Sequence, residues 1–134
     1  MSGLWAAVLL ALPLFGVSRS GARAAAGDWG GLHLRVSVDE KGASLDFDCA
    51  HGRISEPLVL GDDGRFEVKG VYAPERPGPI LRDEAERGQP ARYRGSVKGD
   101  VMTLHVSFGE GDAATELGPY ELTHGKPGRV FKCK

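Results

Sequence analysis

Apolar and polar residues alternate with a period of two through most of the chain after residue 27. This period is typical of β-strands that bury one face and expose the other. The clearest case is 32–38, where leucines and valines alternate with polar residues. Further strands are predicted over 44–49, 54–60, 66–72, 91–97, 102–108, 115–123 and, as a short last strand, 129–133.

Short segments rich in Gly, Asp and Lys separate several of these runs, at 40–42, 61–64 and 98–100. Gly and Asp accept the positive φ angles of tight turns. No stretch after residue 26 carries a helical apolar period of about 3.6 without Gly or Pro. We therefore predict a single-domain, all-β, up-and-down antiparallel β-barrel of about eight strands, because closure removes exposed edges. A two-sheet β-sandwich is the alternative.

The same alternation assigns the barrel interior. The predicted inward side chains are large and apolar, and they include Phe47, Phe66, Tyr72, Tyr93, Met102, Phe108, Tyr120 and Phe131. Among the inward positions, only Gly70 and Gly95 leave space. Any internal pocket is therefore expected to be small and apolar, with few polar groups to orient a ligand. Pro119 cannot donate to a ladder, which predicts an edge or a bulge in 115–123.

Residues 1–26 have the form of a secretory signal peptide. The apolar run 4–17 is shorter than the roughly 20 residues of a membrane span. Ala24-Ala25-Ala26 offers a cleavage site, and 22–24 offers a rival one. We expect a secreted or periplasmic protein with one domain, 27–134, and no membrane span after signal removal.

Charge excludes some classes of partner. The chain carries 17 Lys and Arg against 18 Asp and Glu, a formal net charge of −1. Two arginines, Arg19 and Arg23, would leave with the signal peptide. The two signs are interleaved rather than gathered in runs, so neither nucleic acid nor an anionic membrane is indicated as a partner. We expect a monomer.

The two cysteines, Cys49 and Cys133, raise the question of a disulfide or a metal site. Two cysteines in an exported chain of this size are usually bridged. The alternation also places both on the inward face at one rim, so a Cys49–Cys133 disulfide is predicted. The nearest candidates for metal ligands are Cys49, His51 and Asp48, but their spacing resembles no known zinc motif. A catalytic thiol would need an unpaired cysteine. No metal, cofactor or catalytic residue is predicted.

In a meander, every second connection lies at the same end of the barrel. The connections expected at 50–52, 73–89 and 109–112 share one end, which also receives Trp29 and Cys133. The other connections are tight turns. Because binding residues concentrate on loops, we expect any function at this end.

The candidate ligand-binding residues are Trp29, Tyr72, Ile80, Leu81, Tyr93 and Glu56. Ile80 and Leu81 are the large aliphatic residues of the long connection 73–89, which is either a solvated loop, or a lid or partner-binding loop. Glu56 falls on the predicted inner face beside Pro57. Either a bulge turns it outward or it anchors an internal pocket, since an unpaired buried carboxylate is costly.

The chain carries five short sequence strings that are considered together: Asp28-Trp29-Gly30-Gly31, Phe47-Asp48-Cys49-Ala50-His51-Gly52, Ala91-Arg92-Tyr93-x-Gly95, Met102-Thr103-Leu104 and Gly125-Lys126-Pro127-Gly128-Arg129-x-x-Lys132-Cys133. Together they resemble a recurring type of small exported bacterial protein of unassigned function, over most of the chain. This resemblance implies no substrate, cofactor or catalytic residue. The Gly-rich start with a tryptophan near the first strand is also similar to lipocalin and avidin barrels, although no ligand-contacting motif of either family can be placed.

These observations predict a non-enzymatic binding protein. The expected interior lacks the paired acids, triads and phosphate cradles that enzymes need. A small apolar molecule at the barrel mouth is the expected ligand. The alternative is a protein–protein interaction or inhibitor module with a filled core that uses the 73–89 loop. A metal-binding or enzymatic role ranks third.

Overall fold

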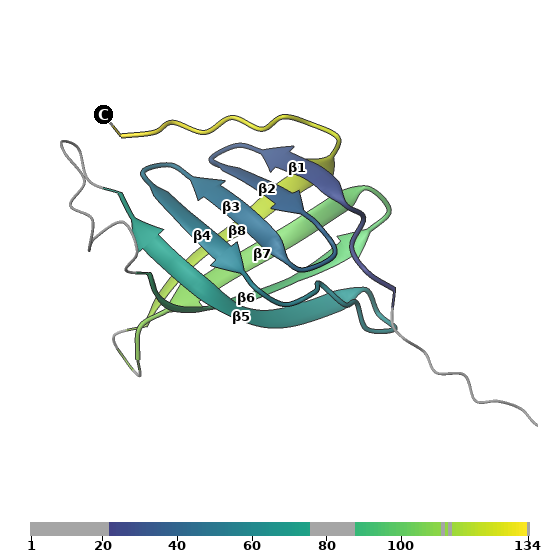
Figure 1. Ribbon diagram of the computed structural model, residues 1–134, viewed down its shortest axis with the longest axis horizontal. Helices are drawn as coiled ribbons and strands as arrows, with labels where there is room; N and C mark the ends of the chain where they lie inside the picture. The colour runs from purple at the N-terminus through teal and green to yellow at the C-terminus, as the bar shows by residue number, and fades with distance from the viewer. Residues whose placement is uncertain (1–21, 76–87, 111, 113, 134) are drawn as a thin grey trace, which may run out of the picture.

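The computed structural model describes residues 22–75, 88–110, 112 and 114–133. Eight antiparallel strands follow one another around a closed barrel in which β8 pairs with β1 (Figure 1). The strands are β1 Gly27–Gly31, β2 Leu34–Val38, β3 Ala43–Phe47, β4 Ala50–Ile54, β5 Arg65–Pro74, β6 Gln89–Lys98, β7 Val101–Phe108 and β8 Thr115–His124. The predicted all-β barrel is therefore confirmed over the sandwich. In the described ranges, no helix has the length and apolarity to cross a membrane.

The first predicted strand, 32–38, begins two residues later than predicted, as β2, and an additional strand, β1, precedes it. Strands β1 and β2 pair with each other, with Trp29 opposite Val36. The turn between them is Leu32-His33, and His33 has φ of 73°. Alternation continues through this turn by coincidence, so the prediction of one strand over 32–38 is wrong at Leu32, which is 58% exposed.

The next two predicted boundaries also move. The connection expected at 50–52 is strand, because β4 starts at Ala50 and the turn is Asp48-Cys49. Cys49 has φ of 55°, a left-handed conformation that is uncommon for a residue other than glycine. Strand β4 then ends at Ile54, so the predicted strand 54–60 is a loop.

The last predicted strand, 129–133, does not belong to the barrel. Residues 125–133, the C-terminal tail, leave β8 and run back over the outside of β1 (Figure 1). His33 N donates to Arg129 O at 2.7 Å, and Arg129 N donates to Gly31 O at 2.9 Å. The barrel keeps eight strands because β1 replaces the expected eighth.

The predicted irregularity at Pro119 is confirmed as a bulge. Leu104 pairs with Tyr120, and Val106 pairs with Leu117. Two residues of β8, Gly118 and Pro119, therefore lie opposite one residue of β7, His105, which is the definition of a bulge.

Aromatic rings occupy the space above the interior glycines. A Cβ atom on Gly70 would lie 2.9 Å from Cε2 of Tyr93, and one on Gly95 would lie 3.0 Å from Cζ of Phe66. The hydroxyl of Tyr93 likewise lies over Gly52. The expectation that Gly70 and Gly95 leave interior space is therefore wrong. Rings and aliphatic side chains fill the barrel.

The two barrel ends differ. One end, the disulfide rim, carries the turns 32–33 and 48–49, the end of β5, the start of β6, the end of β7 and the start of β8 (left in Figure 1). The opposite N-terminal end receives residues 22–26. There Ala24 N donates to Leu58 O at 3.0 Å, and Leu60 N donates to Ala22 O at 2.7 Å. Part of the predicted signal peptide thus packs on the barrel, and residues 1–21 lie outside the described residues.

Candidate functional site

Cys49 and Cys133 form the predicted disulfide at the disulfide rim. Their Cα atoms lie 4.8 Å apart, and 84 positions separate them in the chain. Neither faces inward as predicted, because Cys49 lies in a turn and Cys133 is exposed at the end of the tail. The tail is not part of the sheet, so it can approach the turn directly. The disulfide fixes the tail across the rim.

Lys132 reinforces this attachment. Its Nζ donates to the carbonyl oxygens of Ala50 at 2.9 Å and Phe47 at 3.2 Å, where β3 and β4 meet. The same ammonium lies 3.1 Å from Oε2 of Glu75. Asp48 also holds the tail, because its Oδ1 accepts from Phe131 N at 2.7 Å. Polar contacts therefore surround the disulfide.

Two histidines pair with carboxylates at this rim. His51 Nδ1 lies 2.8 Å from Glu75 Oε2, and His33 Nδ1 forms a short hydrogen bond with Asp48 Oδ2. Burial by itself raises the pKa of Glu75, but hydrogen bonds from His51 and Lys132 outweigh burial and hold that pKa below its usual value. Glu75 is thus a carboxylate between two donors.

Four aromatic rings gather inside the rim. Tyr72 and Phe108 stack with centroids 4.4 Å apart and planes inclined by 11°. Phe47 lies edge-on to Tyr72 at 5.2 Å and to Tyr120 at 5.8 Å. Phe47 is buried, whereas the other three are partly exposed. Tyr72, Phe108 and Tyr120 over Phe47 are called the aromatic platform below. Burial raises the pKa of Tyr72 and Tyr120 and keeps both hydroxyls neutral.

Two exposed apolar side chains lie at the same end of the barrel. Leu32 in the first turn is 58% exposed, and Phe131 in the tail is 56% exposed. The Phe131 ring lies 6.0 Å from the ring of His33. The prediction that Phe131 points inward is wrong, because residues 129–133 are not a strand.

The predicted site residues do not all meet at the rim. Trp29 is 1% exposed, and its Nε1 donates to Ala25 O at 2.9 Å, toward the N-terminal end. Tyr93 is fully buried and donates to Val71 O at 2.5 Å. Of the described candidates, only Tyr72 belongs to the aromatic platform.

The remaining candidates lie elsewhere. Glu56 is exposed and accepts from Lys69 N at 3.2 Å, so it faces outward, but it does so in a loop rather than at a bulge in a strand. Ile80 and Leu81, with most of the 73–89 connection, lie outside the described residues. Sequence reasoning missed Glu75 and Lys132, although Lys132 adjoins a cysteine predicted to reach this rim.

The possible metal ligands have other partners. Cys49 is disulfide-bonded, Asp48 contacts His33, and His51 contacts Glu75. Within the ranges that the structure describes, no three His, Cys, Asp or Glu side chains form a group that could hold a metal ion.

The fold and the rim together define a class of protein: a closed eight-stranded antiparallel barrel whose C-terminal tail is disulfide-bonded across one rim. Comparisons with family models, curated proteins and solved structures each found no match to this chain.

Proposed function

We propose that the protein is an exported, non-enzymatic binding protein that recognises a partner protein through the disulfide rim. One observation carries this proposal: the aromatic platform and two exposed apolar residues, Leu32 and Phe131, gather at one end of a filled barrel. The disulfide is compatible with export, because such bonds persist in oxidising compartments.

The composition of the rim matches that of a protein–protein interface. Such interfaces have an apolar, often aromatic centre surrounded by polar groups. Here Tyr72, Phe108 and Tyr120 supply the centre, and the pairs His33–Asp48 and His51–Glu75 supply polar groups near it. Tyrosine is also among the residues that most often dominate binding energy.

The rim is also fixed before any partner binds. The disulfide, Lys132 and the Asp48–Phe131 hydrogen bond hold the tail in place. A preorganised surface loses less conformational entropy on binding, which favours affinity. The rim carboxylates Asp48 and Glu75 each bind a histidine and a group of the tail, which suits a structural role rather than a catalytic one.

A small apolar molecule is the second candidate ligand. The nearly parallel stack of Tyr72 and Phe108 favours it, because a flat apolar group can extend such a stack. The filled interior restricts such a molecule to the rim, whereas small-molecule sites usually enclose most of their ligand. For this reason we place a partner protein first.

Site-specific photocrosslinking in the protein's own host tests the proposal. A photoreactive phenylalanine replaces Phe131 at the rim, and a matched variant carries it at Val59, which is 45% exposed at the N-terminal end. We expect one defined protein adduct from position 131 and none from position 59. The adduct should disappear when Tyr72 is changed to Ala in a variant that still melts cooperatively.

Two outcomes would contradict the proposal. Equal adducts from both positions would indicate non-specific contact, and no adduct from position 131 would remove the rim as a protein interface. Native mass spectrometry of protein from its own host separates the candidates. A small-molecule adduct that is lost in Tyr72→Ala would favour the second candidate instead.

A further inference from the structure

The outer face of β5, β6 and β7 is a second surface, separate from the tail and the disulfide. Antiparallel register sorts its outward side chains into three cross-strand rows: Arg65–Ser96–Thr103, Glu67–Arg94–His105 and Lys69–Arg92–Ser107. Positive charge is therefore aligned with hydroxyl groups across three neighbouring strands.

Positively charged side chains that are spread along the sequence lie together on this face. The outward side chains of β5 and β6 include one anion, Glu67, and five cations: Arg65, Lys69, Arg92, Arg94 and Lys98. The whole chain has a formal charge of −1. In the sequence these charged residues are separated by inward apolar residues, so they form no run. In the folded sheet alternate residues point to the same side, which brings the charged side chains together.

Lys69 and Arg92 lie directly opposite each other on β5 and β6. Like charges in this position destabilise a sheet. Arg92 Nε lies 3.3 Å from Glu67 Oε2 along the diagonal, which offsets part of the repulsion. A bound anion would offset more of it.

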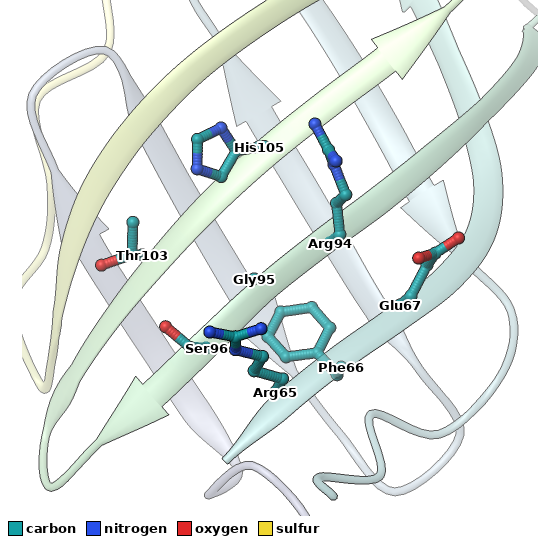
Figure 2. A pocket seen from close by; sticks show the side chains of 8 residues that line it. All are labelled: Arg65, Phe66, Glu67, Arg94, Gly95, Ser96, Thr103 and His105. Carbon is teal, nitrogen blue, oxygen red and sulfur yellow. The ribbon is translucent and has the colours of Figure 1, made fainter. Parts of the chain in front are cut away.

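The face is hollowed where the rows cross it. A hollow of about 700 Å³ lies among these side chains. Figure 2 shows the Arg65 guanidinium beside Ser96, with Thr103 and His105 on the next strand. An adjoining hollow of about 450 Å³ includes Lys69, Arg92 and Ser107 in its lining. Both hollows lie over β5, β6 and β7, and the charged and hydroxyl side chains that line them are called the polar track below.

The existing ion pairs leave this track available. Arg92 pairs with Glu67, Arg94 pairs with Glu116, and Arg65 pairs with Asp63, and the side chains of all three pairs are about half exposed or more. Exposed pairs of this kind contribute little to stability, so a ligand with several negative charges can replace the carboxylates. The serine and threonine hydroxyls both donate and accept, which suits the hydroxyl groups of sugars.

We propose that this outer face binds an acidic polysaccharide, a sugar polymer that carries carboxylate or sulfate groups. Arg92 and Arg94 lie two residues apart on β6, a spacing of roughly 6.6 Å, which suits neighbouring charges along a linear polymer.

Calorimetric titration of the mature protein tests the inference with three probes: polygalacturonate, dextran sulfate and neutral dextran. We expect the two acidic polymers to bind at about 50 mM salt and to bind at least about ten-fold more weakly at 200 mM, because salt screens exposed charges. Neutral dextran should not bind. Binding of neutral dextran as tight as that of the acidic polymers, or no binding of either acidic polymer at low salt, would overturn the proposal.

A pair of charge-matched variants locates the site. Lys69→Gln with Arg92→Gln should weaken binding of whichever acidic polymer binds by about ten-fold or more. Lys41→Gln with Lys126→Gln removes the same charge at exposed positions elsewhere and should change affinity by less than about two-fold. Equal weakening in both variants would show a response to net charge alone and would refute a site on β5–β7.

Discussion

At the scale of single residues, Tyr93 explains why the barrel is filled. Its ring covers Gly70, its hydroxyl reaches over Gly52, and that hydroxyl donates to Val71 O. A large residue at position 93 in β6 therefore depends on two residues without side chains, Gly70 on β5 and Gly52 on β4. Such aromatic–glycine pairing is a known means of stabilising glycine in sheets.

We predict that Gly70→Ala lowers the free energy of unfolding by about 2 kcal/mol, because overpacking a filled core forces side chains or backbone to move. The new Cβ would lie 2.9 Å from Tyr93 Cε2 and still closer to Arg53 O. Gly61→Ala is the control, since its Cβ would meet only the side chain of Asp63 at 3.3 Å and Arg65 O at 3.6 Å. Urea denaturation measures both, and equal stability of the two variants would contradict the packing argument.

Tyr93 also makes stability depend on alkaline pH. Burial, followed by the charge of Tyr72, raises the pKa of Tyr93 well above 10.0, so the folded state holds this proton more tightly than the unfolded state. The resulting stabilisation is complete below pH 10.0 and is lost as pH rises through the folded-state pKa.

Tyr93→Phe should cost about 1 kcal/mol at neutral pH, because Val71 O loses its donor. The variant should then lose less stability than the parent protein between about pH 10 and pH 11.5. Urea midpoints across this range measure the effect, and parallel pH profiles for the two proteins would show that Tyr93 is not the group responsible.

Whether a side chain points into or out of the barrel was predictable where the backbone is extended. Leu34, Phe66 and Met102 are buried as expected. The count fails at Leu32 and Phe131, because counting every second residue assumes strand geometry. His33 and Cys49 turn the chain with positive φ, and no side-chain property of either residue announces this.

At the scale of elements, the C-terminal tail depends on the disulfide. Changing Cys49 and Cys133 to Ala should lower the free energy of unfolding by up to about 4 to 5 kcal/mol, the chain-entropy value for a loop of this length. Strand circular dichroism should persist, because β1–β8 close the barrel without the tail. Loss of the β signal at low temperature would show instead that the barrel requires the tail.

The segment before β1 contributes in a similar way. Without residues 22–26 the protein loses two backbone hydrogen bonds to the 57–60 loop and the donor contact of Trp29 Nε1 with Ala25 O. A protein that starts at Ala22 should therefore be more stable than one that starts at Gly27, by about 2 kcal/mol. Thermal melts compare the two forms, and the intact mass of the exported protein identifies which form the host makes.

Two strand assignments could not be read from the pattern. Strand β1, Gly27–Gly31, has one large apolar residue, so it shows no alternation. Gly30 is needed there because the tail passes against it, at Lys126 and Gly128. Residues 129–133 are predicted as a short strand, but the tail makes only a single bridge, between Leu32 and Arg129. Both assignments depend on how the tail packs on β1, and this packing cannot be read from the local sequence of either segment.

At the scale of the whole molecule, the rim and the outer face should act separately. Tyr72→Ala should abolish the protein adduct that the photoreactive group at position 131 forms, and it should leave polysaccharide binding unchanged. Lys69→Gln with Arg92→Gln should have the opposite effect. Crosslinking yield and calorimetry on the same two variants test this, and loss of both activities in either variant would mean that the two surfaces are coupled.

The position of the candidate site was more predictable than its contents. Every second connection of a meander lies at the same end, and this rule placed 50–52, 73–89, 109–112 and Cys133 together. The described residues of these segments do lie at one end. The polar cluster could not be predicted, because His51, Glu75 and Lys132 come from segments far apart in the sequence. Trp29 lies toward the N-terminal end because β1, which was not predicted, precedes β2 and runs antiparallel to it, so the chain enters the barrel from the opposite end.

The path of the C-terminal tail has a practical consequence for labelling. The described chain enters at one pole of the barrel, and Cys133 finishes at the opposite pole, beside the aromatic platform. A tag or carrier fused downstream of Cys133 would therefore cover the surface that we expect to bind. Immobilisation through the start of the mature chain leaves that pole facing the solution, and screens for a partner belong in that orientation.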